Sequence, residues 1–211
     1  MDYQKTHLKE VINIRYIYTV HYFEYSKDYV FEGEEHDFWE FLYVDKGEVD
    51  VLAGDRKIRL VQGEMIFHKP AEFHNVWSTG ETAPNLVVIS FECKSPAMKR
   101  FENTLLSVDN YCKNLLALII KESISAFSSP LNTPELKKLE RRSDSVVFGC
   151  EQLIITYLTQ MLIYLVRKSL DTRSESRISS AMKENADGDM ADSVIEYLGR
   201  NVKRKIRFID V

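Results

Sequence analysis

The stretch Glu34-Glu35-His36-Asp37-Phe38-Trp39-Glu40-Phe41-Leu42-Tyr43-Val44-Asp45-Lys46-Gly47 decides the fold, together with Gly63-Glu64-Met65-Ile66-Phe67-His68-Lys69-Pro70-Ala71-Glu72-Phe73-His74 further along the chain. Each segment is rich in apolar and aromatic residues and is bounded by glycine or proline, which predicts a strand that ends in a turn. Successive side chains of a strand point to opposite faces, so Glu40 shares a face with Leu42 while Phe41 takes the other. Both segments also carry polar side chains at positions that an interior pocket could use.

The same kind of pattern extends over the first part of the chain, to about Cys93. An alternating stretch from Ile12 to Tyr22 predicts a long, half-buried strand. Further strands, separated by turn signals that contain glycine, are expected over residues 38–44, 49–53, 57–61, 65–68, 75–78 and 85–92. Short strands at this spacing predict a barrel or a sandwich.

The pattern changes to a helical period near Ser95-Pro96 and keeps that period to about residue 169. A break at Pro130 and Pro134 leads into a second helix, for which Thr133 is the expected N-cap. The first helical section is expected to hold Leu105, Leu106, Leu115, Leu116, Leu118, Ile119 and Ile120.

The second helix is apolar on more than one face. Between residues 146 and 166 one apolar stripe runs through positions 147, 150, 154, 158, 161 and 165, and another through 146, 153, 157 and 164. A helix with two apolar faces needs two partners. One partner is the barrel or the first helix, and the other is predicted to be a second copy of the chain in a homodimer. The alternative is a single helical core without a dimer.

Composition and charge favour an intracellular globular protein. The 211 residues are 45% hydrophobic and 28% charged, which is enough to bury a substantial core. A net charge of −4 argues against nucleic-acid binding by the chain as a whole, since duplex binding needs a basic face. The most hydrophobic run, residues 153–166, is shorter than the roughly 20 residues that a membrane helix needs. Three widely spaced cysteines fit reduced thiols, so we expect a cytoplasmic protein without a membrane partner.

The last forty residues differ from the rest. Residues 170–189 are polar and predict a linker. After the linker, Val194, Ile195 and Leu198 form one apolar helix face, and the sequence ends before a core could close around it, so we expect it to be cut inside a domain. A basic cluster, which we interpret as a solvated helix end, consists of Arg200, Lys203, Arg204, Lys205 and Arg207.

The first of the two opening segments resembles the first motif of cupin barrels, in which His-x-His is followed by Glu and then by Gly. His36, Glu40 and Gly47 fall at the second His, the Glu and the Gly, whereas Glu34 stands in place of the first His. The resemblance implies that the Glu40 face of this strand points into the barrel.

The second segment resembles the second cupin motif. Gly63, Pro70 and His74 occupy the matching positions, and Glu72 replaces the usual glycine. Taken with the Glu34 replacement, this resemblance implies a cupin whose set of metal ligands is incomplete.

The whole layout resembles that of AraC-type transcription regulators, and residues 192–211 resemble the first helix of that family's DNA-binding part and the start of the next. The resemblance implies an α+β fold: an N-terminal cupin-like β-barrel (double-stranded β-helix), a helical dimerisation hairpin, and the first helix of a truncated helix-turn-helix domain. The implied domains are a ligand-sensing barrel at 1–94, a helical dimerisation section at 95–169, a linker at 170–189 and the start of the helix-turn-helix domain at 190–211.

The same resemblance implies the effector-sensing and dimerisation region of a DNA-binding regulator, not an enzyme. A small polar metabolite, with a sugar as one candidate, would bind in the barrel and be relayed to the DNA-binding domain. Operator DNA would bind only to the full-length protein, since major-groove readout needs a supported recognition helix. Two alternatives stay open: a metal-dependent cupin enzyme, and a dimerisation module whose barrel is filled by its own side chains.

The candidate ligand-binding residues follow from the cupin resemblance. His36, Glu40 and His74 are expected to converge at the barrel mouth, and an aromatic side chain to supply an apolar wall. Two imidazoles and a carboxylate also suit iron or zinc. Sensor domains of the AraC type usually bind organic ligands without a metal, so neither a metal nor another cofactor is expected. The full candidate set is His36, Glu40, His74, His68, Trp77, Tyr43 and Arg15.

Overall fold

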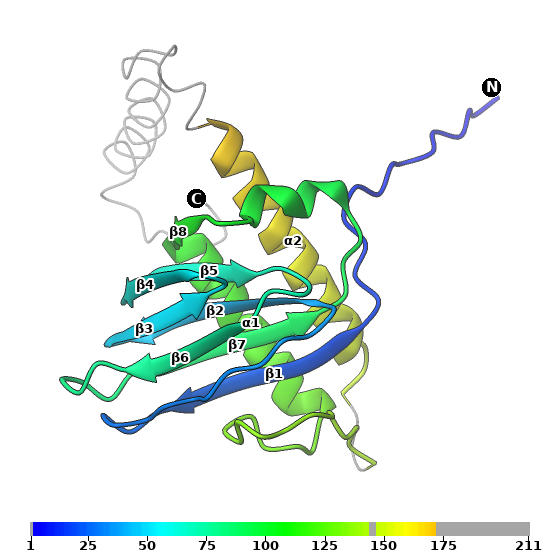
Figure 1. Ribbon diagram of the computed structural model, residues 1–211. Coiled ribbons are helices and arrows are strands. Elements are labelled where there is room, and N and C mark those ends of the chain that lie inside the picture. Colours follow the sequence, from blue (N-terminus) through cyan, green and yellow to red (C-terminus); the bar gives the residue numbers. More distant parts are fainter. Residues whose placement is uncertain (1, 144–146, 172–211) are drawn as a thin grey trace, which may run out of the picture. The chain divides into compact units, whose positions relative to one another are not determined.

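The computed structural model describes residues 2–143 and 147–171 (Figure 1). The chain divides into two compact units, residues 1–166 and 167–211, and the description below concerns the first. Its core contains residues from both the expected barrel and the expected helical section. The basic cluster, the terminal helix and nearly all of the expected linker lie outside the described residues, so these stay predictions.

Two antiparallel sheets form most of the first unit (Figure 1). The larger sheet has the strand order β1 (Ile17–Glu24), β7 (Asn85–Phe91), β2 (Trp39–Lys46), β5 (Glu64–His68) and β8 (Leu105–Ser107). The smaller sheet has the order β4 (Arg56–Val61), β3 (Glu48–Ala53) and β6 (His74–Ser78). Strands that pair in these sheets are often far apart in sequence, as β1 and β7 are, so the fold depends on long-range pairing.

Inward side chains from both sheets form one apolar core. Leu42 and Val44 of β2 belong to this core, whereas Phe41 and Tyr43, which alternate with them, belong to another. The structure therefore confirms the predicted faces of β2. The core shared by the two sheets consists of Phe23, Tyr25, Leu42, Val44, Val49, Val51, Ala53, Leu60, Ile66, Val76, Leu86 and Val88.

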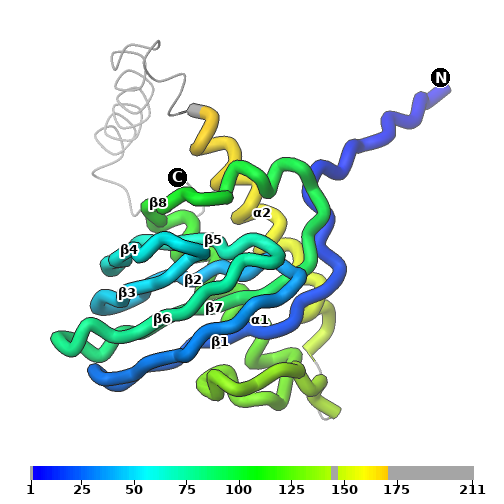
Figure 2. The backbone as a smooth tube through the Cα atoms, viewed as in Figure 1, coloured from blue at the N-terminus to red at the C-terminus, as the bar shows by residue number. Residues whose placement is uncertain are grey.

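A second core joins the other face of the larger sheet to the helices. The fully buried side chains of Phe41, Phe67 and Phe91 project into it from three neighbouring strands. Both long helices lie on the same side of the sheets (Figure 1), where they cover this aromatic face. In Figure 2 the N-terminal residues extend away from the sheets, and residues 2–11 are exposed. The helical elements are η1 (Pro96–Phe101), α1 (Asn110–Ala126) and α2 (Cys150–Asp171).

Two predicted strand and helix assignments are corrected. The first strand begins at Ile17, although the alternation begins at Ile12. Ile12 and Ile14 are buried without belonging to a strand, so the alternation there reflects burial alone. Leu105 and Leu106, predicted to be helical, lie in β8, because they pair with β5 at the edge of the larger sheet. Their short apolar run fits a strand as well as a helix.

The predicted start of the second helix is also corrected. Thr133 does not cap a helix, and α2 begins only at Cys150. The intervening segment bonds to the end of α1 instead: the amide of Ser128 donates to the carbonyl of Glu140 over 2.8 Å, and the amide of Arg142 donates to Ala126 over 2.9 Å. These contacts are distant in sequence, so capping signals could not reveal them.

One face of α2 packs against the sheet. Ile154, Leu158 and Leu165 are buried in the second core, whereas Leu153 is half-buried and Ile155 is 37% exposed. By length and composition α2 is also long and apolar enough to cross a membrane, unlike the shorter run considered in the sequence. Core helices of globular proteins can share that property, and 28% of the apolar window of α2 is buried in the structure.

Candidate functional site

A row of four polar residues crosses the larger sheet at the site. Thr19, Ser90, Glu40 and His68 are successive cross-strand neighbours on β1, β7, β2 and β5. Directly paired residues point to the same face, and all four line one cavity. The Thr19 and Ser90 hydroxyl oxygens are 2.7 Å apart, and the Ser90 hydroxyl donates to Oε2 of Glu40 over 2.6 Å. The register of the sheet therefore fixes the Glu40 carboxylate inside the barrel.

The facing side of the site comes from β6 and from the segment before β2. Glu34 and His74 form an isolated antiparallel bridge, in which each amide donates to the other's carbonyl oxygen at 2.9 and 3.0 Å. At Gly33, where φ is +107°, a Cβ atom would lie 2.8 Å from the His74 carbonyl oxygen and 2.6 Å from the Phe73 ring. Only glycine fits this close approach, which brings Glu34 and His36 over the cavity.

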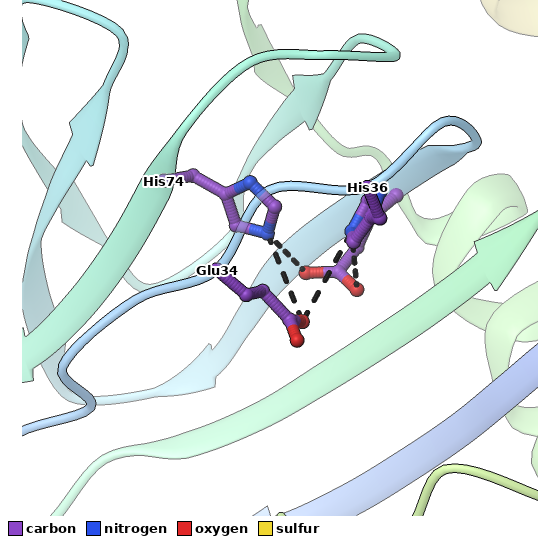
Figure 3. Close-up of side chains that lie close together, drawn as sticks. Glu34, His36 and His74 are labelled. Carbon is purple, nitrogen blue, oxygen red and sulfur yellow. Dashed lines mark ion pairs between the residues drawn. The ribbon is translucent and has the colours of Figure 1, made fainter.

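Glu34, His36, Glu40 and His74 converge at this point. Figure 3 shows Glu34, His36 and His74 with their ion pairs. Nε2 of His74 lies 3.3 Å from Oε1 of Glu40, and Nε2 of His36 lies 3.7 Å from Oε2 of Glu40. Both Nε2 atoms are 4.0 Å from Oε1 of Glu34. One ligand atom from each residue lies within 4.8 Å of all the others, which makes the group a candidate metal site.

Backbone carbonyl groups orient both imidazoles. Nδ1 of His36 is 3.1 Å from the carbonyl oxygen of Phe38, and Nδ1 of His74 is 2.9 Å from that of Glu72. A carbonyl oxygen only accepts, so each Nδ1 carries the hydrogen that it donates. In the neutral rings each Nε2 then presents a lone pair to the carboxylates, and neither Nε2 has a hydrogen-bond partner among the described residues. With both rings neutral, four acceptor groups face one another, and protonation of an imidazole or a hydrogen-bond donor from a ligand would relieve this.

Burial and charge set the protonation states. Burial of Glu40 favours the neutral acid, but the neighbouring imidazoles of His36 and His74 and the Ser90 hydroxyl outweigh this and hold the pKa of Glu40 below its ordinary value. Burial acts to lower the pKa of His74, but the Glu40 carboxylate outweighs it and the pKa is raised. Deep burial lowers the pKa of His68. Near neutral pH, Glu40 is therefore a carboxylate and His68 a neutral imidazole.

The cluster lines a cavity of about 490 Å³ inside the barrel. Cavities of roughly 300–1,000 Å³ are the usual size for small-molecule sites. Four of the five histidines of the chain line this cavity, and residues 134–137, from the segment between α1 and α2, line it as well. The barrel is thus not filled by its own side chains, which counts against the filled-barrel alternative. The apolar part of the lining includes Phe23, Tyr25, Phe31, Leu42, Val76 and Val88.

Four of the seven predicted site residues, His36, Glu40, His68 and His74, line this cavity. Their binding of a ligand stays a prediction. The other three do not line it. Tyr43 lies three residues after Glu40 in β2, so its side chain points to the opposite face of the strand, where it is buried on the helix side. The Trp77 ring is covered by the Lys57 ammonium group at 4.9 Å, and Arg15 lines a separate cavity beside α2.

Sequence reasoning missed several polar residues of the cavity. Ser90 is a lone hydroxyl in the apolar run of β7, a signal that was available but that pointed to no partner. His21 of β1 is buried and lines the cavity. Glu34 was treated as a lost donor, yet its carboxylate reaches the cluster. Thr19 reaches the cavity because it pairs with Ser90 across the sheet, a contact that no local sequence pattern indicates.

Two facing antiparallel sheets around a cavity, followed by helices, define an α+β protein with a cupin-like fold. Residues 16–110 match a family model described as an AraC-like ligand binding domain. This segment contains β1 to β8 and all four residues of the cluster. A comparison with curated proteins finds no match.

Solved structures with partial similarity include three bacterial proteins. A cupin superfamily protein from Desulfitobacterium hafniense is 17% identical over 34% of this chain, with a TM-score of 0.32. A predicted oxalate decarboxylase from Thermotoga maritima is 17% identical over 33%, with a TM-score of 0.32. A protein from Bacillus halodurans is 23% identical over 38%, with a TM-score of 0.33. The chain spans 63%, 61% and 66% of their respective lengths.

Proposed function

We propose that this chain is the effector-sensing and dimerisation region of an AraC-type, DNA-binding transcription regulator of the cytoplasm, and not an enzyme. A small polar metabolite, with a sugar as one candidate, binds in the barrel cavity. The observation that carries the proposal is the cavity itself, which combines a buried acid and imidazoles with apolar walls. It lies largely within the segment that matches an AraC-like ligand binding domain.

The polar end of the cavity suits a ligand that donates hydrogen bonds. Glu40 accepts one bond from Ser90 and has acceptor capacity left for a ligand hydroxyl or amine. His21 adds a further buried ring nitrogen without a partner among the described residues. An acceptor left unpaired in a buried site is costly, so a ligand without matching donors would bind poorly. Selectivity for a polar metabolite would follow from this arrangement.

The proposed relay to the helices runs through the segment between α1 and α2. Residues 134–137 line the cavity, and further along the same segment Arg141 donates two hydrogen bonds, at 2.7 and 3.0 Å, to Glu151 in the first turn of α2. An effector that displaces this segment would therefore move contacts made to α2. Such a relay requires the effector to bind two arrangements of the protein with different affinity.

The proposed homodimer uses the apolar part of α2 that the sheet leaves uncovered, around Leu153 and Ile155. Ile155→Arg would place a charge on this face without touching the buried side of the helix. We expect the wild-type chain to sediment as a dimer and the variant to shift to monomer. Asp28→Arg, at an exposed position in the segment after β1, is the control. A wild-type monomer at tens of micromolar would remove dimerisation from the proposal.

Effector binding is tested by thermal shift and calorimetry of the purified chain against sugars, polyols, amino acids and amines. A ligand that binds only the folded state raises the unfolding temperature. We expect a hit to lose its effect in Glu40→Gln and to keep it in Trp77→Phe, which alters a side chain outside the cavity. Equal binding by Glu40→Gln would place the ligand elsewhere. Operator binding is then measured with the full-length protein, with and without the hit.

A metal-dependent cupin enzyme is the second candidate, favoured by the convergence of imidazole and carboxylate donors. Such an enzyme needs an open coordination position and a substrate that it converts. Incubation of metal-supplemented protein with each hit, followed by mass spectrometry, separates the two functions. Product formation that is lost in Glu40→Gln would favour the enzyme, and unchanged hits would favour the sensor.

A further inference from the structure

We propose that a second cavity, beside α2, binds a small monocarboxylate with an apolar body. This cavity has a volume of about 270 Å³ and is called the α2 cavity below. Its walls come from residues 14–18 at the start of β1, from the segment between α1 and α2, and from the first turns of α2. It is distinct from the barrel cavity, with which it shares only Tyr18 and Lys137.

The inner wall of the α2 cavity is apolar. Ile14, Ile154 and Leu158 belong to the second core and are buried, yet all three line the cavity. Ile155, which is 37% exposed, lines it nearer to solvent. Each methylene group that leaves water for such a surface strengthens binding about fourfold. The inner wall therefore suits the alkyl or aryl body of a ligand.

The exposed lining of the α2 cavity is basic. Four cationic side chains line it, and Glu151 is the one carboxylate among its lining residues, so the lining carries a net charge of +3 on a chain whose net charge is −4. All four cations are exposed, which places them at the entrance and not at the inner wall. A positive entrance attracts anions. The four are Arg15, Lys137, Lys138 and Arg141.

Two of these cations are available to a ligand. Lys138 and Arg141 already pair with carboxylates, at 2.8 and 2.7 Å. Arg15 and Lys137 form no ion pair with the described residues, although Nε of Arg15 donates to the side chain of Asn13 over 3.2 Å. The two terminal nitrogens of the Arg15 guanidinium therefore stay available, and a guanidinium matches the geometry of a carboxylate.

These features together define the class of ligand. An apolar inner wall behind two unpaired cations suits a molecule with one anionic end and an apolar body. The volume lies just below the range of about 300–1,000 Å³ that is usual for small-molecule sites, so the ligand is a small acid. Short aliphatic acids and aryl acids meet both conditions.

The α2 cavity borders both regions to which the proposed function assigns a role. Tyr18 and Lys137 also form part of the barrel cavity, and Ile155 belongs to the proposed dimer face. A bound acid would therefore change one wall of the barrel cavity and cover part of the dimer face. Any coupling between the two ligands would be reciprocal. This consequence rests on the proposed sensor function, whereas the binding of the acid does not.

The test titrates the 211-residue chain with octanoate and follows the NMR signals of labelled isoleucine and valine methyl groups. The labels separate the two cavities. Val76 and Val88, and no isoleucine, line the barrel cavity, whereas isoleucines and no valine line the α2 cavity. We expect saturable shifts that are largest at the isoleucines of the α2 cavity. These are Ile14, Ile17, Ile154 and Ile155.

Ligand and protein variants test the chemistry. Hexanoate is two methylene groups shorter than octanoate and should bind about tenfold more weakly. Octylamine has a similar tail with a positive charge and should give no saturable shift. Arg15→Gln should weaken octanoate binding at least threefold, and because Arg15 is exposed this variant leaves the core intact. Lys113→Gln, at an exposed position of α1 outside the cavity, removes the same charge and should bind octanoate as the wild type does.

The inference is overturned if octanoate gives no saturable shift, if the shifts centre on Val76 and Val88, or if octylamine binds equally well. Isoleucine shifts that follow protein concentration and not octanoate would also overturn it, because a second copy of the chain would then fill the cavity. Failure of this inference is distinct from failure of the sensor proposal. A metabolite that shifts Val76 and Val88 without any octanoate binding would leave the sensor standing, and octanoate binding without such a metabolite would leave the α2 cavity standing as a site.

Discussion

Ser90→Ala is the sharpest test of the polar row that fixes the candidate site. Ser90 is 2% exposed, and its hydroxyl donates to a Glu40 carboxylate that is itself buried. Removing it leaves Glu40 without its donor from the sheet side and leaves the Thr19 hydroxyl without the neighbour it has at 2.7 Å. Because Glu40 is buried, solvent cannot fully replace the hydrogen bond that this carboxylate loses.

The expected magnitude follows from the charge of the acceptor. A hydrogen bond to a charged group contributes about 1.5–3 kcal/mol to the free energy of unfolding. At about 2.1 cal/mol/K per residue, the 166 residues of the first unit unfold with an entropy of about 0.35 kcal/mol/K. A loss of about 2 kcal/mol therefore lowers the unfolding midpoint by about 6 °C.

Ser123→Ala supplies a matched control. Ser123 is also fully buried, but its hydroxyl has no hydrogen-bond partner among the described residues. Its removal from the interior of α1 should leave stability unchanged or raise it by a few tenths of a kcal/mol, because alanine favours helices. Thermal and urea unfolding followed by circular dichroism measure both variants.

The comparison decides whether the row is energetically important. If the midpoint of Ser90→Ala lies within about 2 °C of that of Ser123→Ala, the bond contributes less than about 1 kcal/mol, and the reasoning about Glu40 is refuted. A loss of stability in Ser90→Ala that is accompanied by unchanged ligand binding would show that the row stabilises the fold without positioning the carboxylate.

Three further perturbations test other parts of the structure. The Arg59 guanidinium holds the pKa of Asp50 below its ordinary value. The pair therefore stabilises the fold above the unfolded pKa of about 3.9, and this contribution is lost as the pH falls. Between roughly pH 5 and pH 2, the urea midpoint should drop more steeply in the wild type than in Asp50→Asn. Gly33→Ala should destabilise by more than Gly80→Ala, since both glycines have positive φ but only Gly33 has atoms within 4 Å of the added Cβ, and equal losses in urea would contradict the tight approach at the site. Leu158→Ala, a fully buried change in α2, should cost about 2–5 kcal/mol, and a loss below about 1 kcal/mol would mean that α2 does not pack as described.

Local patterns predicted much of the fold. Period-two alternation assigned Leu42 and Val44 to one face of β2 and Phe41 and Tyr43 to the other, and the structure confirms it. The glycine and proline turn signals separated the strands at nearly the right places. The convergence expected for His36, Glu40 and His74 came from the cupin resemblance, because no local pattern brings such distant residues together.

Segments that depend on distant partners were assigned less well. Leu105 and Leu106 form a short apolar run that is compatible with either a helix or a strand, and pairing with β5 decides between them. The segment after Thr133 carries helical signals, yet its backbone bonds to the end of α1. In both cases the decisive hydrogen bonds join residues that no sequence window contains.

The sequence by itself determined which residues alternate, where turns interrupt the strands, and that His36, Glu40 and His74 occupy motif positions. Only the tertiary structure decided what completes the site. Sheet register places Ser90 beside Glu40. The bridge between Glu34 and His74 brings the carboxylate of Glu34, which stands at the position of a motif histidine, into the cluster. The physical reason is that strand alternation is a property of neighbouring residues, whereas register and facing distance are set by the packing of the whole barrel.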